Sequence, residues 1–263
     1  QAGLPAANLT ICHPNSVDSS GQPAGGCHGT GINHNKFYLF SEMVDGSTDV
    51  VVQSSANLTN SQLRQHNDLL IIRDDAALYD AYLDYWNDLQ ASSYNSNYYT
   101  STVGDTGTKA YFYPRASNDT IVSILGNVSC QPSSIIRVSV AFFTSGRSDV
   151  GDALVSLANS GCDVRVIMRE GSTIEPTLAS TAVDLTVFPD YASGTNFHNK
   201  YLLIESDYGA NQTYQRLVWT GSHNYTYPAL RSNDEALLKI NEGAVYDAYL
   251  ADWNAIHDNA LGP

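Results

Sequence analysis

The sequence predicts an α/β protein made of two pseudo-symmetric halves, each a mixed β-sheet flanked by helices, with a site at their junction. A stretch that reads HNKFYLF at 34–40 returns as HNKYLLI at 198–204. A second stretch, YDAYLDYWNDL at 79–89, returns as YDAYLADWNAI at 246–256. Between the copies, short apolar runs alternate with amphipathic ones, a pattern typical of helices layered on a sheet.

The pieces between these stretches recur in the same order. Each HNK run is followed by an apolar run with a polar end, VVVQSSAN at 50–57 and LVWTGSHN at 217–224. The two HNK runs are 164 positions apart, whereas Asn57 and Asn224 are 167 apart, which indicates a three-residue insertion in the second hairpin. One unit of strand, hairpin, strand, strand and helix therefore occurs twice.

Polar residues also recur at matched places. Because residues i and i+2 of a strand point to the same face, His34 and Lys36 share a face, as do His198 and Lys200. At the same spacing of 167, the acid Asp68 matches Glu235. Trp86 matches Trp253 in the same way, and both tryptophans are expected to anchor the core. Polar residues matched at one strand end predict a single site at the junction of the halves.

The chain is expected to divide near residue 100. Residues 91–108 are rich in Ser, Asn, Thr, Tyr and Gly and indicate a linker between a first half over 1–100 and a second over 101–263. The first half is expected to have strands at 36–40, 50–53 and 69–72 and a helix from about Asp75 to Gln90. Before its HNK run, the second half is expected to have strands at 109–113, 135–143, 164–168 and 185–188 and a helix at 149–159.

The first half is shorter than the second. Only 33 residues precede His34, and they are rich in Gly, Pro, Ser and Asn, whereas about ninety residues of the second half precede His198. The first half therefore lacks N-terminal strands that its counterpart possesses. A sheet without them would expose apolar edges and faces. We expect the chain to be the larger fragment of a processed precursor, completed by a companion N-terminal chain.

Composition disfavours nucleic-acid binding and favours a secreted protein. The chain has 13 Lys and Arg against 27 Asp and Glu, a net charge of −14, which disfavours binding to a nucleic-acid backbone. Charged residues make up only 15% of the chain, and there are 17 Tyr, as in many secreted proteins. No apolar run approaches the roughly 20 residues that a membrane-spanning helix needs. No signal peptide is visible, so any such segment has been removed.

Four cysteines are present, and none forms a CxxC pair. An even number in a chain of secreted character favours two disulfides rather than a zinc site. Pairing within each half gives Cys12–Cys27 and Cys130–Cys162, although spacing alone leaves other connectivities open.

The motif HxK followed by GSxN, present twice, resembles the phospholipase D superfamily. GSHN at 221–224 matches the motif fully, while SSAN at 54–57 has Ser54 in place of glycine. The aspartate usual seven residues after the histidine is replaced by Ser41 and Glu205. The phrases INHNKF and VVVQSSANL are most similar to secreted phospholipase D-like proteins of actinobacteria.

The resemblance implies a secreted, metal-independent phosphodiesterase that hydrolyses or transfers the distal phosphodiester bond of a phospholipid or related head group. It implies His34 as the nucleophile that forms a phosphohistidine and His198 as the acid. Lys36 and Lys200 would bind the phosphate oxygens as point charges. Amide donors would come from Asn57 and Asn224, and Asp68 and Glu235 would each accept Nδ1–H from a histidine. No cofactor and no metal are expected.

Other residues are candidates for binding the substrate (Ser55, Ser222, His223 and Trp219). Transient contact with a membrane surface is expected for a lipid substrate. One alternative is a nuclease of the same superfamily, which the acidic balance disfavours. Another is a non-catalytic module that binds phospholipids, which the intact His, Lys and Asn of both copies disfavour.

Overall fold

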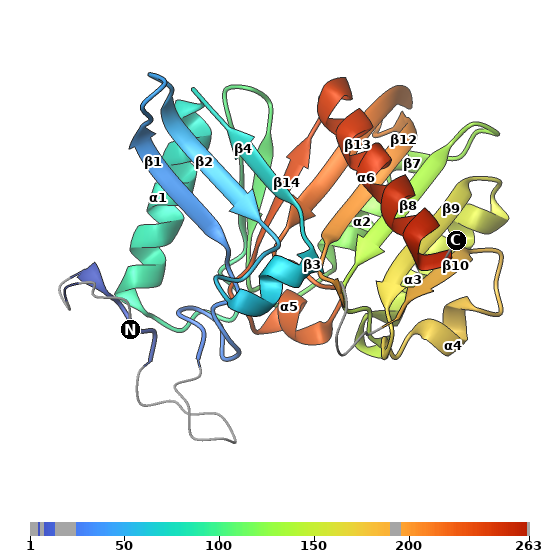
Figure 1. Cartoon of the computed structure of the whole chain (residues 1–263), viewed down its shortest axis with the longest axis horizontal. Coiled ribbons are helices and arrows are strands. Elements are labelled where there is room, and N and C mark those ends of the chain that lie inside the picture. Colours follow the sequence, from blue (N-terminus) through green and yellow to red (C-terminus); the bar gives the residue numbers. More distant parts are fainter. Residues whose placement is uncertain (1–4, 6–7, 14–24, 190–195, 262–263) are drawn as a thin grey trace.

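The computed structural model describes residues 5, 8–13, 25–189 and 196–261, which contain a three-stranded, a nine-stranded and a two-stranded sheet. Figure 1 shows the two larger sheets side by side. The three-stranded sheet contains β1 (Phe37–Glu42), β2 (Thr48–Ser54) and β4 (Leu69–Ile72), in the antiparallel order β1-β2-β4. Helix α1 (Ala76–Ala91) packs on β1 and β2. The predicted strands and helix of the first half are therefore present.

The larger sheet has nine strands, in the order β10-β9-β8-β12-β13-β14-β6-β5, with β7 pairing β12. Its strands are β5 (Thr100–Val103), β6 (Lys109–Phe112), β7 (Val128–Ser129), β8 (Ile135–Val140), β9 (Asp163–Arg169), β10 (Asp184–Phe188), β12 (Lys200–Tyr208), β13 (Thr213–Gly221) and β14 (Ala236–Ile240). The β8–β9 and β9–β10 pairs are parallel and the others antiparallel, which confirms the predicted mixed α/β fold.

Helices cover both faces of the larger sheet. They are α2 (Thr120–Leu125), α3 (Ser148–Asn159), α4 (Glu175–Leu178), α5 (Tyr227–Arg231) and α6 (Gly243–Leu261), together with the 3₁₀ helices η2 (Asn60–Arg64) and η3 (Ser145–Arg147). Figure 1 shows α6 lying across β12 and β13, on which it packs. Helices α2 and α3 bury their apolar side chains in a separate core on the other side. No helix of the described residues is long and apolar enough to cross a membrane.

The expected linker at 91–108 is partly wrong. Residues Thr100–Val103 form β5, which pairs antiparallel with β6 through a turn that includes Gly104 and Gly107. Gly107 has a φ of +83°, a conformation that glycine adopts without strain. Threonine and valine favour strands, and the pairing with β6 outweighs the polar composition of this stretch.

Helix α1 starts at a strong capping residue. The carboxylate of Asp75 accepts hydrogen bonds from the backbone of Leu78 and of the turn at 105–106. Leu78, Tyr82, Tyr85 and Leu89, at helical spacing, are buried. The prediction for Trp86 is wrong, because its side chain lies on the outer face of α1 and is 45% exposed, whereas Trp253 is buried as expected.

Strand registers reveal which residues of the two copies match. Phe37 pairs with Gln53 in the first copy and Tyr201 with Thr220 in the second, as the sequence alignment predicts. The next strand of the repeat is displaced by one residue. Val51 pairs with Ile72, and its counterpart Val218 pairs with Ile240. Residues of β4 and β14 therefore match at a spacing of 168, whereas residues of β2 and β13 match at 167. The counterpart of Glu235 is therefore Asn67, and the predicted pairing of Glu235 with Asp68 is wrong by one residue. A twofold relation between the halves stays a prediction, as does the boundary at residue 100.

The middle residue of each HNK run anchors it to the repeated helix. Asn35 Nδ2 donates to the hydroxyl of Tyr85 in α1 at 2.8 Å, and Asn199 Nδ2 donates to Asp252 in α6 at 3.0 Å. Tyr85 and Asp252 occupy matched positions, 167 apart. Because the asparagine points toward the helix, the neighbouring histidine and lysine point to the opposite side.

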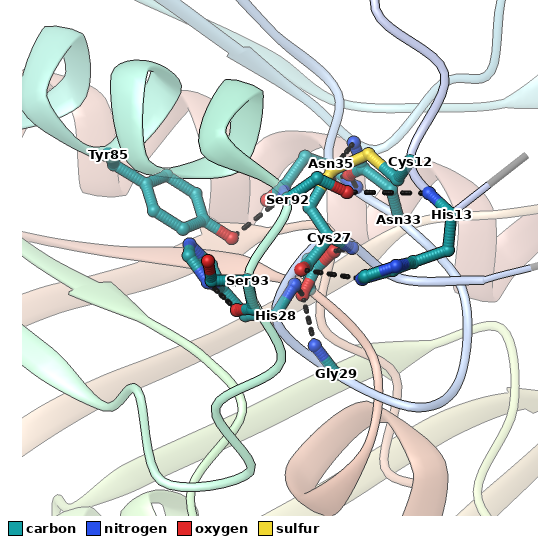
Figure 2. Close-up of a disulfide and its surroundings, with 11 residues drawn as sticks. Cys12, His13, Cys27, His28, Gly29, Asn33, Asn35, Tyr85, Ser92 and Ser93 are labelled. Atoms are coloured by element: carbon teal, nitrogen blue, oxygen red, sulfur yellow. Dashed lines mark hydrogen bonds between the residues drawn. A yellow bond between two sulfur atoms is a disulfide. The ribbon is translucent and has the colours of Figure 1, made fainter.

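The segment before His34 is held against the strand that carries Glu235. Asp234 accepts backbone hydrogen bonds from Cys27, His28 and Gly29, and the Cys12–Cys27 disulfide closes this loop (Figure 2). A Cβ atom on Gly29 would lie 1.7 Å from the carbonyl oxygen of Ser232, so only glycine fits at this crossing. The loop thereby positions His34 beside Glu235.

The second disulfide joins Cys130, after β7, to Cys162, before β9. Both predicted disulfides are thus confirmed, and all four cysteines of the chain are paired.

The outer face of the first sheet is less covered than its counterpart. Phe40 is 42% and Leu69 is 54% exposed. Their counterparts by register, Ile204 and Leu237, lie in the core beneath α2 and α3. Among the described residues, β1 pairs only with β2, whereas β12 pairs with both β13 and β8.

Candidate active site

Each HNK run is hydrogen-bonded to the opposite half of the chain. The backbone N–H of His34 donates to the carbonyl of Asp234 at 3.0 Å. The backbone N–H of His198 donates to the carbonyl of His66 at 2.9 Å, where β11 (Asn196–Phe197) pairs in parallel with β3 (Gln65–His66). These crossed contacts bring the two predicted motifs together at the junction of the halves.

His34 faces a buried carboxylate. Its Nδ1 lies 2.9 Å from both oxygens of Glu235, a side chain with no exposed surface. Glu235 also accepts a hydrogen bond from Nδ2 of Asn233 at 3.2 Å. The predicted role of Glu235 as the partner of a histidine therefore fits the geometry.

His198 faces an amide instead of a carboxylate. Its Nδ1 lies 3.2 Å from Oδ1 of Asn67. The Asn67 amide nitrogen donates to the carbonyls of Gln62 and Gln65, so its oxygen must be the atom that faces the ring. His198 Nδ1 is then the donor, which leaves Nε2 without a proton in the neutral ring.

The predicted contact between Asp68 and a histidine is wrong. The carboxylate of Asp68 accepts hydrogen bonds from the backbone N–H of Lys200 at 3.3 Å, from the hydroxyl of Thr220 and from that of Tyr249 at 3.5 Å. Burial raises the pKa of Asp68, partly offset by the hydrogen bond from Thr220. Neighbouring residues of an extended chain point to opposite sides. Asn67 therefore faces His198, while Asp68 points the other way and bonds to Lys200 of β12 and Thr220 of β13.

The two lysines lie close enough to affect each other. Burial lowers the pKa of Lys36 to about 8, while the charge of Glu235 opposes this shift. The pKa of Lys200 is lowered to about 7, mainly by burial and next by the positive charge of Lys36. The negative charges of Asp68 and Glu235 act in the opposite direction. Each ammonium donates to the backbone carbonyl of the histidine two residues before it. Two buried ammonium groups in one site attract an anion.

His198 is strongly disfavoured as a cation. Burial, followed by the positive charges of Lys200, Lys36 and His34, lowers its pKa to about 2. Lys200 Nζ lies 3.1 Å from His198 Nδ1 and 3.3 Å from its Nε2. Histidines and lysines of both HNK runs therefore form one electrostatic unit.

Ser55 and Ser222 connect strands in this arrangement. Their hydroxyl oxygens accept backbone N–H groups of Asp68 at 2.9 Å and of Ala236 at 3.0 Å, and both side chains are fully buried. Their predicted place in substrate binding stays a prediction. They join the end of one strand to the start of the next in each half.

The remaining candidates are spread around the site. Trp219 is fully buried in the core against Tyr208, so its prediction as a substrate contact is wrong. His223 is also buried, tilted against Tyr113, and burial lowers its pKa well below the usual value. Asn224 is buried, and its Oδ1 has no hydrogen-bond partner within the described part of the chain.

An open pocket of about 510 Å³ lies beside Asn67 and Asp68 and is lined by η2 and by Asn57. A second cavity of about 650 Å³ lies between the N-terminal segment and α1, with Trp86, Asn33 and Asn35 in its wall. Within the described ranges, no group of three or more His, Cys, Asp and Glu is placed to hold a metal ion.

Asn67 and Asp234 were missed in the sequence. A signal for Asn67 was present, because aligning LLII at 69–72 with LLKI at 237–240 gives a spacing of 168 and matches Asn67 to Glu235. Asp234 directly precedes Glu235, but nothing in the sequence indicates that it binds the loop at 27–29.

One protein family matches most of the second half of the chain. Residues 129–256, from β7 to α6, match the family described as "Cardiolipin synthase, PLD-like domain". This stretch of the second half is therefore similar to a phospholipase D-like domain. The matched region includes His198, Lys200 and Glu235 but stops short of the first HNK run, so the first copy rests on the internal repeat and the fold.

Two solved structures with TM-scores above 0.5 support the mixed α/β fold of this chain. A phosphatidylserine synthase from Haemophilus influenzae Rd KW20 is 15% identical with a TM-score of 0.55, over 88% of this chain and 62% of that one. A polyphosphate kinase from Porphyromonas gingivalis is 10% identical with a TM-score of 0.56, over 84% of this chain and 32% of that one. Nuc from Salmonella typhimurium, a phospholipase D family member, is 22% identical with a TM-score of 0.44, over 61% of this chain and 96% of that one. No curated protein sequence matches the chain.

Proposed function

We propose that this chain is a secreted phosphodiesterase of the phospholipase D type, which hydrolyses or transfers the distal phosphodiester bond of a phospholipid or related head group. The observation that carries the proposal is the meeting of two histidines and two lysines, from opposite halves, in one buried site. The similarity of the second half to a phospholipase D-like domain supports it.

Each group in the site has a task in such a reaction. One histidine Nε2 attacks phosphorus and forms a phosphohistidine, while the other gives its proton to the departing alkoxide. The second histidine then takes a proton from the water or alcohol that attacks the intermediate. Lys36 and Lys200 hold the non-bridging oxygens and stabilise the charge that develops on them. Asn57 and Asn224 are the proposed amide donors.

A lipid or small diester fits the site better than a nucleic acid. The net charge of −14 repels a long polyanion, whereas a single phosphodiester group meets two buried ammonium groups. A phospholipid substrate requires transient contact with a membrane surface, which we propose as well. Both disulfides agree with export to an oxidising compartment.

The test is a panel of substrates. Vesicles of phosphatidylcholine, vesicles of phosphatidylethanolamine and plasmid DNA are incubated with the protein, and released head group and nicked DNA are measured. We expect head-group release from vesicles and no cleavage of DNA. Lys36→Ala and Lys200→Ala should abolish release, whereas Lys109→Ala, outside the site, should not. Cleavage of DNA alone would establish a nuclease, and binding without release would establish a lipid-binding module.

Turnover should persist in saturating EDTA. The two lysines supply the positive charge that a metal ion provides in other phosphodiesterases. Activity lost to EDTA and restored by calcium or zinc would contradict the proposed mechanism.

A further inference from the structure

The two histidines of the site have unlike partners, and this difference separates their roles. By strand register, Asn67 occupies in the first half the place that Glu235 occupies in the second. His34 Nδ1 faces the carboxylate of Glu235, whereas His198 Nδ1 faces the amide oxygen of Asn67. The pairs therefore match in position but differ by one negative charge.

The carboxylate of Glu235 faces Nδ1 of His34. It has no exposed surface, and its other hydrogen bond within the described residues comes from the neutral amide of Asn233. A buried carboxylate needs a positive partner, because removing it from water is costly. The carboxylate accepts Nδ1–H of His34, an arrangement that supports an imidazolium able to donate a proton from Nε2.

The surroundings of His198 favour the neutral ring. Lys200 on its own strand, and Lys36 and His34 from the other half, act on it with positive charge. Asp68, the acid predicted to pair with a histidine, is bonded to Lys200 N–H and Thr220 rather than to the ring. Because Nδ1–H donates to Asn67, Nε2 carries the lone pair, which lies 3.3 Å from the Lys200 ammonium in the free protein and can attack phosphorus once that lysine holds the substrate's phosphate oxygens.

We propose that His198 is the nucleophile and His34 the general acid, the reverse of the order that the resemblance implies. This assignment rests on the proposed phosphodiesterase function. The lone pair of His198 Nε2 forms the N–P bond as the P–O bond to the alcohol breaks. The departing oxygen keeps the bonding electrons and takes the Nε2 proton of His34. Neutral His34 then accepts a proton from water as the water oxygen binds phosphorus, and the N–P electrons return to His198.

Asn67 is a positioning residue in this scheme. Its amide oxygen holds the tautomer of His198 without adding the negative charge that would favour protonation. A carboxylate there would keep His198 charged over part of the working pH range and remove its lone pair.

The first experiment uses bis(p-nitrophenyl) phosphate, whose leaving group departs without a general acid. We expect His34→Gln to release about one p-nitrophenol per protein molecule in a burst and then stop, because the base that activates water is missing. His198→Gln should give no burst. Peptide mapping of the trapped His34→Gln protein should find the phosphoryl group on His198. A burst from His198→Gln, or a phosphoryl group on His34 in the wild-type protein, would overturn the assignment.

The second experiment needs no turnover. Nitrogen-15 NMR of labelled histidines reports the protonation of His34 and His198 in the free protein. We expect His198 to be neutral and protonated on Nδ1 at pH 6–8. Asn67→Asp should raise the pKa of His198, and Asn60→Asp, which adds the same charge on the neighbouring surface loop, should not.

The two experiments separate the possible failures. A His198 that is charged in the free protein at pH 6–8 would overturn the role assignment, whatever the substrate. The expected ionisation without turnover of any diester in the panel would instead overturn the proposed function.

Discussion

Two lysine side chains share a buried anion site, and at the scale of residues their protonation governs what the site can bind. The pKa of Lys200 is about 7 and that of Lys36 is about 8, mainly because both are buried. A lysine with a lowered pKa is charged below that pKa and neutral above it. A bound phosphodiester anion favours the charged form, so binding and protonation are coupled.

The first prediction concerns this coupling. As the pH rises from 7 to 9, the free protein loses both ammonium charges, so kcat/KM should fall through this range, with the loss mainly in KM. Initial rates over pH 5–10 on a soluble diester would measure it. Lys109→Ala should show the same pH dependence as the wild type. A kcat/KM that stays constant up to pH 10 would contradict the lowered pKa values.

The second prediction separates the two acids that the sequence paired. Glu235→Gln removes the charge beside His34 and should lower kcat by roughly 10³-fold or more, as in other carboxylate–histidine pairs, with little change in Tm. Asp68→Asn disturbs a buried carboxylate bonded to Lys200 N–H and Thr220, so it should lower Tm. Thermal unfolding and kinetics of both variants provide the test. An unchanged kcat in Glu235→Gln would contradict the role of that acid.

At the scale of elements, the two disulfides hold segments at different distances from the site. Cys12–Cys27 closes the loop that leads to His34, whereas Cys130–Cys162 connects β7 to β9 away from the histidines. The loop at 27–29 is also held by three backbone hydrogen bonds to Asp234 (Figure 2). The position of His34 therefore depends on a segment with little regular structure of its own.

The third prediction compares the two disulfides. Replacing both cysteines of a pair by serine should cost about 3–4 kcal/mol of unfolding free energy in each case, because the closed loops have 15 and 32 residues. Only the Cys12→Ser, Cys27→Ser variant should also lower kcat. Denaturant unfolding and initial rates, measured below the transition, distinguish the effects. Equal kcat in both double variants would show that the N-terminal loop does not position His34.

At the scale of the whole molecule, the first half has less cover than the second. Phe40 and Leu69 of the first half are exposed. The residues that match them in the second half, Ile204 and Leu237, are buried under α2 and α3. In the described part of the chain, the outer edge of β1 has no strand where β12 has β8. A strand followed by a helix, placed as β8 and α3 are, would cover both the edge and the face.

The fourth prediction follows from this surface and keeps the proposal of a companion N-terminal chain. Because all four cysteines are paired within the chain, we expect the companion to be held without a disulfide. Native mass spectrometry of the protein from its source should show a second polypeptide, which dissociates under denaturing conditions without reductant. Phe40→Asp should weaken the complex, whereas Asp80→Asn, on the exposed side of α1, should not. A folded, active monomer of 28.5 kDa alone would contradict the proposal.

Spacing and period along the chain were enough to predict the repeated unit and the two His–Lys pairs, and they favoured the two disulfides without excluding other connectivities. The residue that faces His198 depends on strand register and is established by the folded structure. A displacement of one residue between β4 and β14 directs Asn67, instead of Asp68, to His198, because alternate residues of a strand face opposite sides. Burial of Ser55, Ser222 and Trp219 likewise depends on strands and helices that meet across the fold, which no local pattern records.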